Sequence, residues 1–197
     1  MKVFITGIEG YIGTVLADEL LKAGYEVAGL DAGFYSEAWL YGEKINNYKI
    51  IHKDIRHITE EDLRGCQAVV HLAELANDPV GELNAETTFD ISCRGTESLI
   101  RACKKAGVKK FIYFSSCSVY GFTDEVVDEN SPVNPLTTYA KAKVSNEKML
   151  LDMGDNDLST VIFRNATVFG LSPRMRFDLA VNSLVGYAYT TGEIKME

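Results

Sequence analysis

The sequence predicts an α/β fold in which a doubly wound parallel sheet is covered by helices on both faces. Apolar runs of strand length alternate along the 197 residues with segments whose apolar residues recur at helical spacing. The first apolar run ends in a glycine-rich turn that leads into such a helical segment. Because parallel strands are joined by right-handed crossovers through helices, we expect the strand order 3-2-1-4-5-6.

The first strand and the turn after it, residues 1–13, read MKVFITGIEGYIG. Gly7 and Gly10 are expected to adopt backbone angles closed to other residues and to let the main chain approach a ligand, and Gly13 to let the next helix lie close to the strand. The helix N-terminus offers free N–H groups to a phosphate. The turn is therefore predicted to bind a dinucleotide through Gly7, Gly10, Tyr11, Ile12 and Gly13.

Asp31 ends the second apolar run, residues 26–31. A carboxylate at this place accepts both hydroxyl groups of an adenosine ribose and repels a 2′-phosphate. Neither Lys nor Arg follows in residues 32–34. The predicted cofactor is therefore NAD rather than NADP, and the alternative is an ordinary turn with a surface aspartate.

The remaining elements continue the alternation of strands and helices. Further strands are predicted at residues 48–52, 66–73, 110–116 and 157–163, with another beginning at 193–196. Helices are predicted at residues 60–63, 84–106, 138–153 and 174–191, and a loop at 77–79.

Composition and charge exclude several classes of protein. Hydrophobic residues make up 46% and charged residues 24%, which is typical of a soluble globular domain, and the net charge of −8 with scattered basic residues argues against a nucleic-acid partner. No apolar run reaches the ~18 residues of a membrane span and no signal-peptide pattern is present, so we expect no membrane partner and a cytoplasmic location. The four cysteines lack metal-ligand spacing; we predict reduced core thiols and no metal site.

A second group of residues has the pattern of an acid/base site. Tyr139 and Lys143 are four residues apart, which places them on one face of a helix. A nearby ammonium stabilises a phenolate, so Tyr139 is suited to exchange a proton near neutral pH, and Ser116 ends a buried strand where it can hold the same substrate hydroxyl. A partly exposed helix with a surface lysine is the alternative. His71 is interpreted as a hydrogen-bonded histidine at a strand end rather than a ligand.

Together these motifs resemble the extended short-chain dehydrogenase/reductases, in particular the NAD-dependent epimerase/dehydratase group of nucleotide-sugar enzymes. The resemblance is carried by TGxxGxxG at 6–13, Asp31, DIR at 54–56, HLA at 71–73, GT at 95–96, SSCSVYG at 115–121 and YxxxK at 139–143. It implies a Rossmann NAD-binding domain at residues 1–170. It also implies that residues 171–197 begin a substrate-binding region, most of which this chain lacks.

The resemblance also implies roles for individual residues. Tyr139 would be the acid/base, and Lys143 would bind the nicotinamide ribose and lower the pKa of Tyr139. Glu74 departs from the pattern, because relatives usually have a small residue there, and a carboxylate near a pyrophosphate would repel it. The implied contacts with the adenine are Asp54 and Ile55, and those lining the rest of the cofactor are Leu72 and Ala73.

The implied reaction is epimerisation or oxidoreduction of a nucleotide sugar. Dehydratases of this family place Asp-Glu after the catalytic Ser or Thr, and Cys117 and Ser118 occupy those positions here, which disfavours elimination. Tyr139 would remove a hydroxyl proton while hydride passes to NAD, and the keto sugar would be reduced on its other face. The predicted substrate contacts are Ser118, Asn165, Arg174 and Arg176.

Several alternatives remain open at this stage. Asn165 lies two positions before the place where many relatives hold the substrate phosphates, and Arg174 and Arg176 are equally well interpreted as surface residues. Trp39, Tyr35 and Tyr41 are expected to cover the edge of the core rather than to wall the adenine. The alternatives to an enzyme are an NAD-binding module or fragment without catalysis and an interaction protein with a degenerate pocket.

Relatives commonly dimerise through the helices after strands four and five, so a homodimer is expected.

Overall fold

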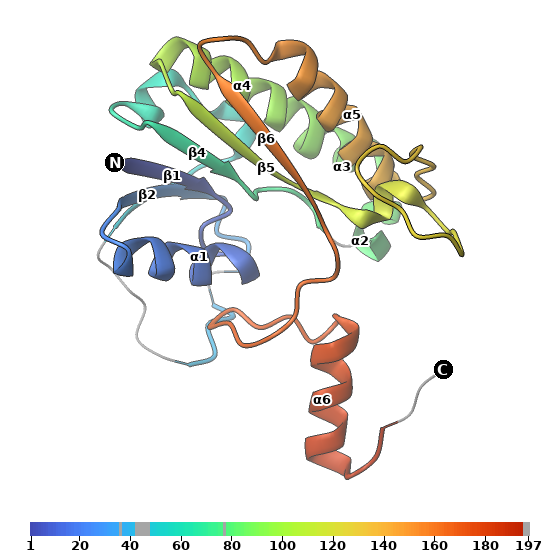
Figure 1. Ribbon diagram of the computed structural model, residues 1–197. Coiled ribbons are helices and arrows are strands. Elements are labelled where there is room, and N and C mark those ends of the chain that lie inside the picture. Colours follow the sequence, from blue (N-terminus) through green and yellow to red (C-terminus); the bar gives the residue numbers. More distant parts are fainter. Residues whose placement is uncertain (36, 42–47, 77, 195–197) are drawn as a thin grey trace.

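The computed structural model of the chain describes residues 1–35, 37–41, 48–76 and 78–194. In this part of the chain six parallel strands form one sheet in the order β3-β2-β1-β4-β5-β6, which confirms the prediction (Figure 1). The strands are β1 (Lys2–Thr6), β2 (Glu26–Asp31), β3 (Lys49–His52), β4 (Ala68–His71), β5 (Lys110–Ser116) and β6 (Ser159–Asn165).

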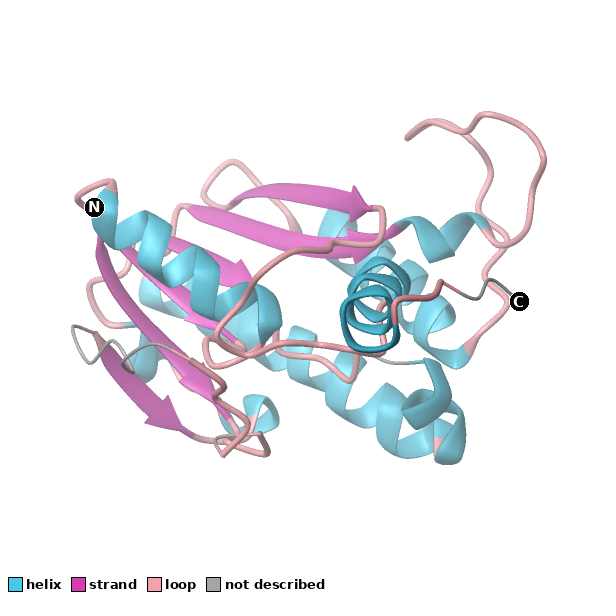
Figure 2. Ribbon diagram, turned by 90° about the horizontal axis from the view of Figure 1, so that it is seen from below, coloured by secondary structure: helices cyan, strands magenta, loops and turns pink. Residues whose placement is uncertain are grey.

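Helices cover both faces of the sheet, with α1 on one face and α4 and α5 on the other (Figures 1 and 2). The described helices are α1 (Tyr11–Lys22), α2 (Asp78–Leu83), α3 (Ala85–Phe89), α4 (Gly95–Ala106), α5 (Thr138–Met153) and α6 (Ala180–Thr191). The core beneath α4 and α5 includes Phe4, Leu30, Leu99, Phe111 and Leu150. The core beneath α1 includes Ile5, Ile8, Ala17, Val27 and Val70.

Helix boundaries follow local capping. The Thr137 side chain accepts a hydrogen bond from the backbone N–H of Ala140 and so begins α5. Gly107 ends α4 in the left-handed conformation, with φ at +72°. The single helix predicted at residues 84–106 is present as α3 and α4 joined by a π-helical turn, Asp90–Arg94.

Three predicted boundaries were wrong. Residues 78–83 form α2 instead of continuing a loop. The last helix begins at Ala180 rather than at residue 174, because the Asn182 side chain bonds the backbone of Gly170 and Arg176 and holds the preceding segment against the helix start. Gly192 ends this helix at φ +75°, and residues 193–194 form no strand; the rest of that predicted strand lies outside the described residues.

Helix α6 stands away from the sheet, beyond the carboxyl ends of the strands (Figure 1). Its surface carries exposed apolar side chains, including Val185, Tyr187 and Tyr189. None of the helices described is both long enough and apolar enough to span a bilayer.

Candidate functional site

A cleft of about 700 Å³ opens at the carboxyl ends of the strands, where the strand order reverses between β1 and β4. Ligands of doubly wound sheets bind at this switch point. All the predicted site residues line this one cleft: Gly7, Gly10, Tyr11, Ile12, Gly13, Asp31, Asp54, Ile55, Leu72, Ala73, Ser116, Ser118, Tyr139, Lys143, Asn165, Arg174 and Arg176.

The glycine turn forms the floor of the cleft and requires two of its three glycines for steric reasons. Gly7 has φ +72°, and a Cβ there would lie 2.9 Å from the backbone nitrogen of Ala73. A Cβ on Gly13 would overlap the carbonyl oxygen of Gly7, so glycine is what lets α1 pack this closely. Gly10 has φ −80°, an ordinary value, so the predicted special backbone angle is wrong there.

Asp31 lies at the end of β2 with its carboxylate fixed in direction. The carboxylate accepts hydrogen bonds from the backbone N–H groups of Glu9, at 3.0 Å, and Gly33, at 2.9 Å. Burial raises the pKa of Asp31, and these two bonds only partly offset the effect. The Asp31 carboxylate is therefore already held in place at the cleft before any ligand binds.

Asp54 and Ile55 form the neighbouring wall. Arg56 donates to both carboxylate oxygens of Asp54, and these bonds hold the pKa of Asp54 below its usual range. The same guanidinium lies 2.5 Å from Asp90. Ile55 is buried against Gly95, where a Cβ would lie 2.7 Å from the Ile55 side chain. The short turn after β3 is therefore anchored at both residues predicted to meet the adenine.

His71 confirms its interpretation as a hydrogen-bonded histidine. Its Nδ1 lies 2.7 Å from the hydroxyl of Thr6 and its Nε2 lies 2.8 Å from the hydroxyl of Thr96. Complete burial lowers the pKa of His71 to about 4, so the ring is neutral at physiological pH. The Thr6 hydroxyl in turn accepts from the backbone N–H groups of Leu72 and Ala73, which positions both residues at the cleft.

The acid/base group is assembled from β5 and α5. The Nζ of Lys143 lies 5.4 Å from the centre of the Tyr139 ring and donates to the carbonyl oxygen of Phe114 at 2.6 Å. The Ser116 hydroxyl begins the 3-10 turn Cys117–Tyr120 by accepting from the backbone N–H of Ser118. The structure therefore brings Ser116, Tyr139 and Lys143 to the same cleft as the glycine turn.

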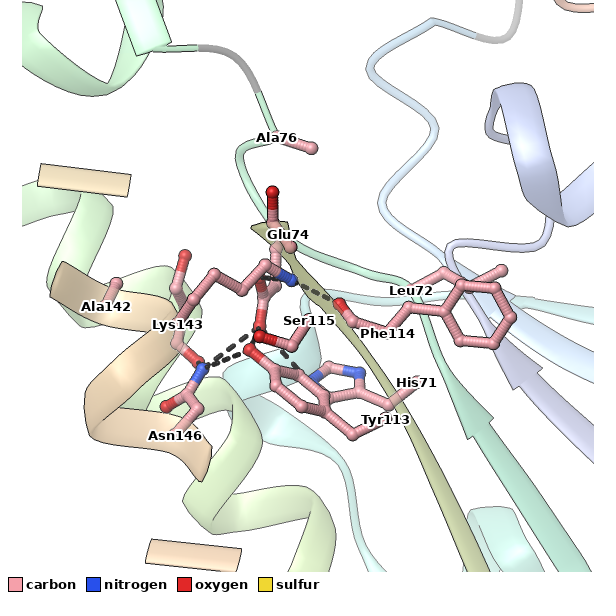
Figure 3. Close-up of polar contacts among 12 residues, drawn as sticks. His71, Leu72, Glu74, Ala76, Tyr113, Phe114, Ser115, Ala142, Lys143 and Asn146 are labelled. Atoms are coloured by element: carbon pink, nitrogen blue, oxygen red, sulfur yellow. Dashed lines mark hydrogen bonds and ion pairs between the residues drawn. The ribbon is translucent and has the colours of Figure 1, made fainter. Parts of the chain in front are cut away.

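Glu74 takes part in this group in a way that the sequence did not reveal. Its carboxylate turns into the space between β5 and α5, where it lies 2.5 Å from Lys143 Nζ (Figure 3). The expected repulsion of a bound pyrophosphate therefore does not follow from its position. Its departure from the small residue that the family resemblance implies marked Glu74 as unusual, but this signal did not identify its partners.

The substrate side of the cleft is formed by the end of β6 and the segment before α6. Asn165 pairs in register with Ser116, and Thr167 also lines the cleft. The Arg174 guanidinium stacks over the Tyr35 ring at 4.4 Å, and its Nε has no hydrogen-bond partner among the residues described. Arg176 is engaged by Asp178 and by the carbonyl oxygen of Ala76.

Two expectations about individual side chains were wrong. Tyr35 is 59% exposed and lines the cleft, so it does not cover the core edge. Cys117 is exposed at the cleft rather than a core thiol, because β5 ends at Ser116 and the chain turns outward there.

Comparisons with known proteins agree with this fold. The family model described as NAD dependent epimerase/dehydratase family matches residues 3–191. A UDP-glucose 4-epimerase of Bacillus subtilis (strain 168) is 33% identical over 202 residues, covering 93% of this chain and 58% of the relative.

Solved structures with a similar fold include two proteins of nucleotide-sugar chemistry. The NAD dependent-NDP-hexosamine 5,6-dehydratase TunA, involved in tunicamycin biosynthesis, has a TM-score of 0.88 at 28% identity over 100% of this chain and 64% of its own. MoeE5 in complex with UDP-glucose and NAD has a TM-score of 0.83 at 29% identity over 98% of this chain and 62% of its own. The chain thus spans about three fifths of the length of these relatives.

Proposed function

Because the chain belongs to the NAD-dependent epimerase/dehydratase family, we propose that it binds NAD and acts in the epimerisation or oxidoreduction of a nucleotide sugar. The cleft fits this cofactor. The glycine turn leaves room for a pyrophosphate where a side chain at Gly7 or Gly13 would obstruct the backbone, and Asp31 offers a fixed carboxylate to the adenosine ribose. Bound NAD would accept a hydride from the substrate and return it.

The proposed acid/base is Tyr139. Its phenolate takes the proton of the substrate hydroxyl during oxidation and returns it during reduction. Ser116 holds the same hydroxyl, and Lys143 binds the nicotinamide ribose and supplies positive charge beside the phenol. The observation that supports this most directly is the presence of all three side chains in the cleft that also holds the glycine turn.

The proposed substrate contacts are Ser118, Asn165, Arg174 and Arg176. Arg174 is the better candidate of the two arginines, because its guanidinium stacks on Tyr35 and donates to the Met175 carbonyl oxygen, whereas Arg176 is already paired with the Asp178 carboxylate. A guanidinium suits a phosphate through paired N–H donors. Cys117 and Ser118 argue against elimination, since neither supplies the carboxylic acid pair that the family's dehydratases place there.

The substitution Tyr139→Phe tests the proposal. We expect turnover of UDP- and dTDP-sugars to fall by about 10²- to 10⁴-fold, because the acid/base group is removed. The affinity for NAD, measured by calorimetry, should change little, and NADP should bind more weakly than NAD. Tyr25→Phe, at a tyrosine outside the cleft lining, is the matched control and should keep full activity. Wild-type turnover in Tyr139→Phe would overturn the assignment.

An NAD-binding module without catalysis is the second candidate. It rests on the glycine turn and Asp31, which form the cofactor side of the cleft independently of Tyr139. NAD binding without turnover of any sugar in the panel would support it over the enzyme.

A further inference from the structure

Four polar side chains, one of them Lys143, form a buried cluster between β5 and α5 (Figure 3). Glu74 comes from the segment after β4, Tyr113 from β5, and Lys143 and Asn146 from α5. The side chains of Glu74 and Lys143 are only 2% and 6% exposed. A carboxylate and an ammonium this deeply buried depend on each other, because removing either leaves an unpaired charge away from water.

The Glu74 carboxylate is held from several directions. One oxygen lies 2.5 Å from Lys143 Nζ, and the other accepts from the Tyr113 hydroxyl at 2.7 Å and from the Asn146 amide at 3.0 Å. The Asn146 amide is itself fixed by the Thr96 hydroxyl at 3.1 Å. The carboxylate therefore cannot swing away from Lys143 without breaking this network.

Two groups therefore hold the Lys143 ammonium. It donates to the Phe114 carbonyl oxygen and forms an ion pair with the Glu74 carboxylate. At least one of its three N–H donors remains for a ribose hydroxyl. The ammonium is 5.4 Å from the Tyr139 ring centre, so the charge of its carboxylate partner is also felt at the phenol.

We propose that Glu74 is a positioning residue for the Tyr139 and Lys143 pair, whose carboxylate holds the ammonium in place and offsets its effect on ionisation of the phenol. This inference rests on the proposed role of Tyr139. Lys143 alone would favour the phenolate strongly; with Glu74 beside it, the pair is close to neutral and Tyr139 ionises at higher pH.

The other titratable groups near Glu74 do not offset the charge of Lys143 in its place. His71 is 4.0 Å from Glu74 and stays neutral, since burial lowers its pKa to about 4. Burial raises the pKa of Tyr113 and of Cys93, so both stay protonated. Arg176 is within electrostatic reach of Tyr139 but is paired with Asp178. Beside the N-terminus of α5, the Glu82 carboxylate accepts from the backbone N–H of Thr138.

Tyrosinate absorbance, titrated between about pH 6 and 11, measures the effect without turnover. The chain has 10 tyrosines, so the signal of Tyr139 is the difference between each protein and the same protein carrying Tyr139→Phe. The quantity compared is the Tyr139 midpoint of each variant relative to that of the wild type. In Glu74→Gln the midpoint should fall by about one to three pH units, because the ammonium then acts alone.

Two further variants separate charge from structure. Glu74→Asp keeps the carboxylate and should titrate closer to the wild type than Glu74→Gln. Glu147→Gln removes a different buried carboxylate, which lies on α5 two helical turns after Tyr139 and pairs with Arg164. This control should leave the Tyr139 midpoint unchanged. An unchanged midpoint in folded Glu74→Gln would overturn the inference. If that variant does not fold, the double variant Glu74→Gln with Lys143→Met, which buries no charge, replaces it, and a Tyr139 midpoint far above that of the wild type would overturn the inference.

The titration tests the role of Glu74, and the turnover assay separately tests the proposed enzyme. A shifted midpoint with no turnover of any sugar would retain the role of Glu74 and reject the proposed enzyme. Turnover that depends on Tyr139, with no shift in Glu74→Gln, would retain the enzyme and reject the role of Glu74.

Discussion

His71 shows how one buried side chain makes folding depend on pH. The ring is enclosed between two threonine hydroxyls and has no contact with solvent, so its charged form is strongly disfavoured in the folded protein. The unfolded chain has no such restriction and binds a proton at the ordinary pKa of 6.5. Acid therefore favours the unfolded state through this residue.

The free energy of unfolding is expected to fall by about 2 kcal/mol as the pH is lowered from 6.5 to about 5. The sign follows from the depressed pKa of folded His71: its contribution is fully present above pH 6.5 and is lost progressively down to about pH 4. Denaturant unfolding at the two pH values measures the change. His71→Asn should be less stable at neutral pH and lack most of this dependence; an equal dependence in that variant would assign it to other groups.

The segment from β1 to α1 is the element on which the cleft is built. Its close packing is a property of backbone against backbone, since the Gly7 carbonyl oxygen and the Ile8 backbone occupy the space that a Gly13 side chain would need. No rotamer change can relieve such an overlap, so the helix itself must move.

Gly13→Ala is expected to destabilise the protein by about 3 kcal/mol or more and to weaken NAD binding. Chemical denaturation and calorimetry measure the two effects. Gly186→Ala in α6 is the matched control: a Cβ there meets nothing within 4 Å, and alanine favours a helix, so stability should stay equal or rise by up to about 1 kcal/mol. Similar losses in both variants would contradict the packing argument.

Helix α5 combines the acid/base pair with a buried polar face. Its buried residues include Ala140, Ala142, Lys143, Asn146 and Glu147. A helix face that buries a lysine and a glutamate is not visible as an apolar stripe, which is why its inner face was hard to predict from periodicity. Leu151 of the same helix is 69% exposed and is available to a partner.

At the scale of the whole molecule, apolar surface remains uncovered in more than one place. Val161 and Phe163 on β6, and Val185 and Tyr189 on α6, are exposed in addition to Leu151. Exposed apolar surface of this kind commonly marks an interface. We predict that a homodimer uses α4 and α5, the arrangement that the family resemblance implies, rather than α6.

Light scattering is therefore expected to give the mass of a dimer. Leu151→Glu should convert it to a monomer, because a charge would be buried at the interface of the two copies. Val185→Glu on α6 is the matched control and should remain dimeric. A monomeric wild type would overturn the dimer, and a monomer produced by Val185→Glu alone would move the interface to α6.

The sequence by itself determined the strand order, the glycine turn and which residues line the cleft. These depend on local patterns: the alternation of strands and helices leaves few topologies, and a parallel sheet brings the ends of its strands to one edge. Residues placed directly after strands, such as Asp31, Leu72 and Ser116, consequently line the same cleft.

Only the tertiary structure decided what those residues contact. Glu74 bonds Tyr113 across 39 residues of sequence and Asn146 across 72, and no periodic pattern encodes such a pairing. The same holds for Tyr35 beneath Arg174 and for Asn182, which sets the start of α6. The direction of each of these side chains and the group that it contacts depend on segments that are distant in the sequence. They are fixed only when the sheet and its helices have packed together.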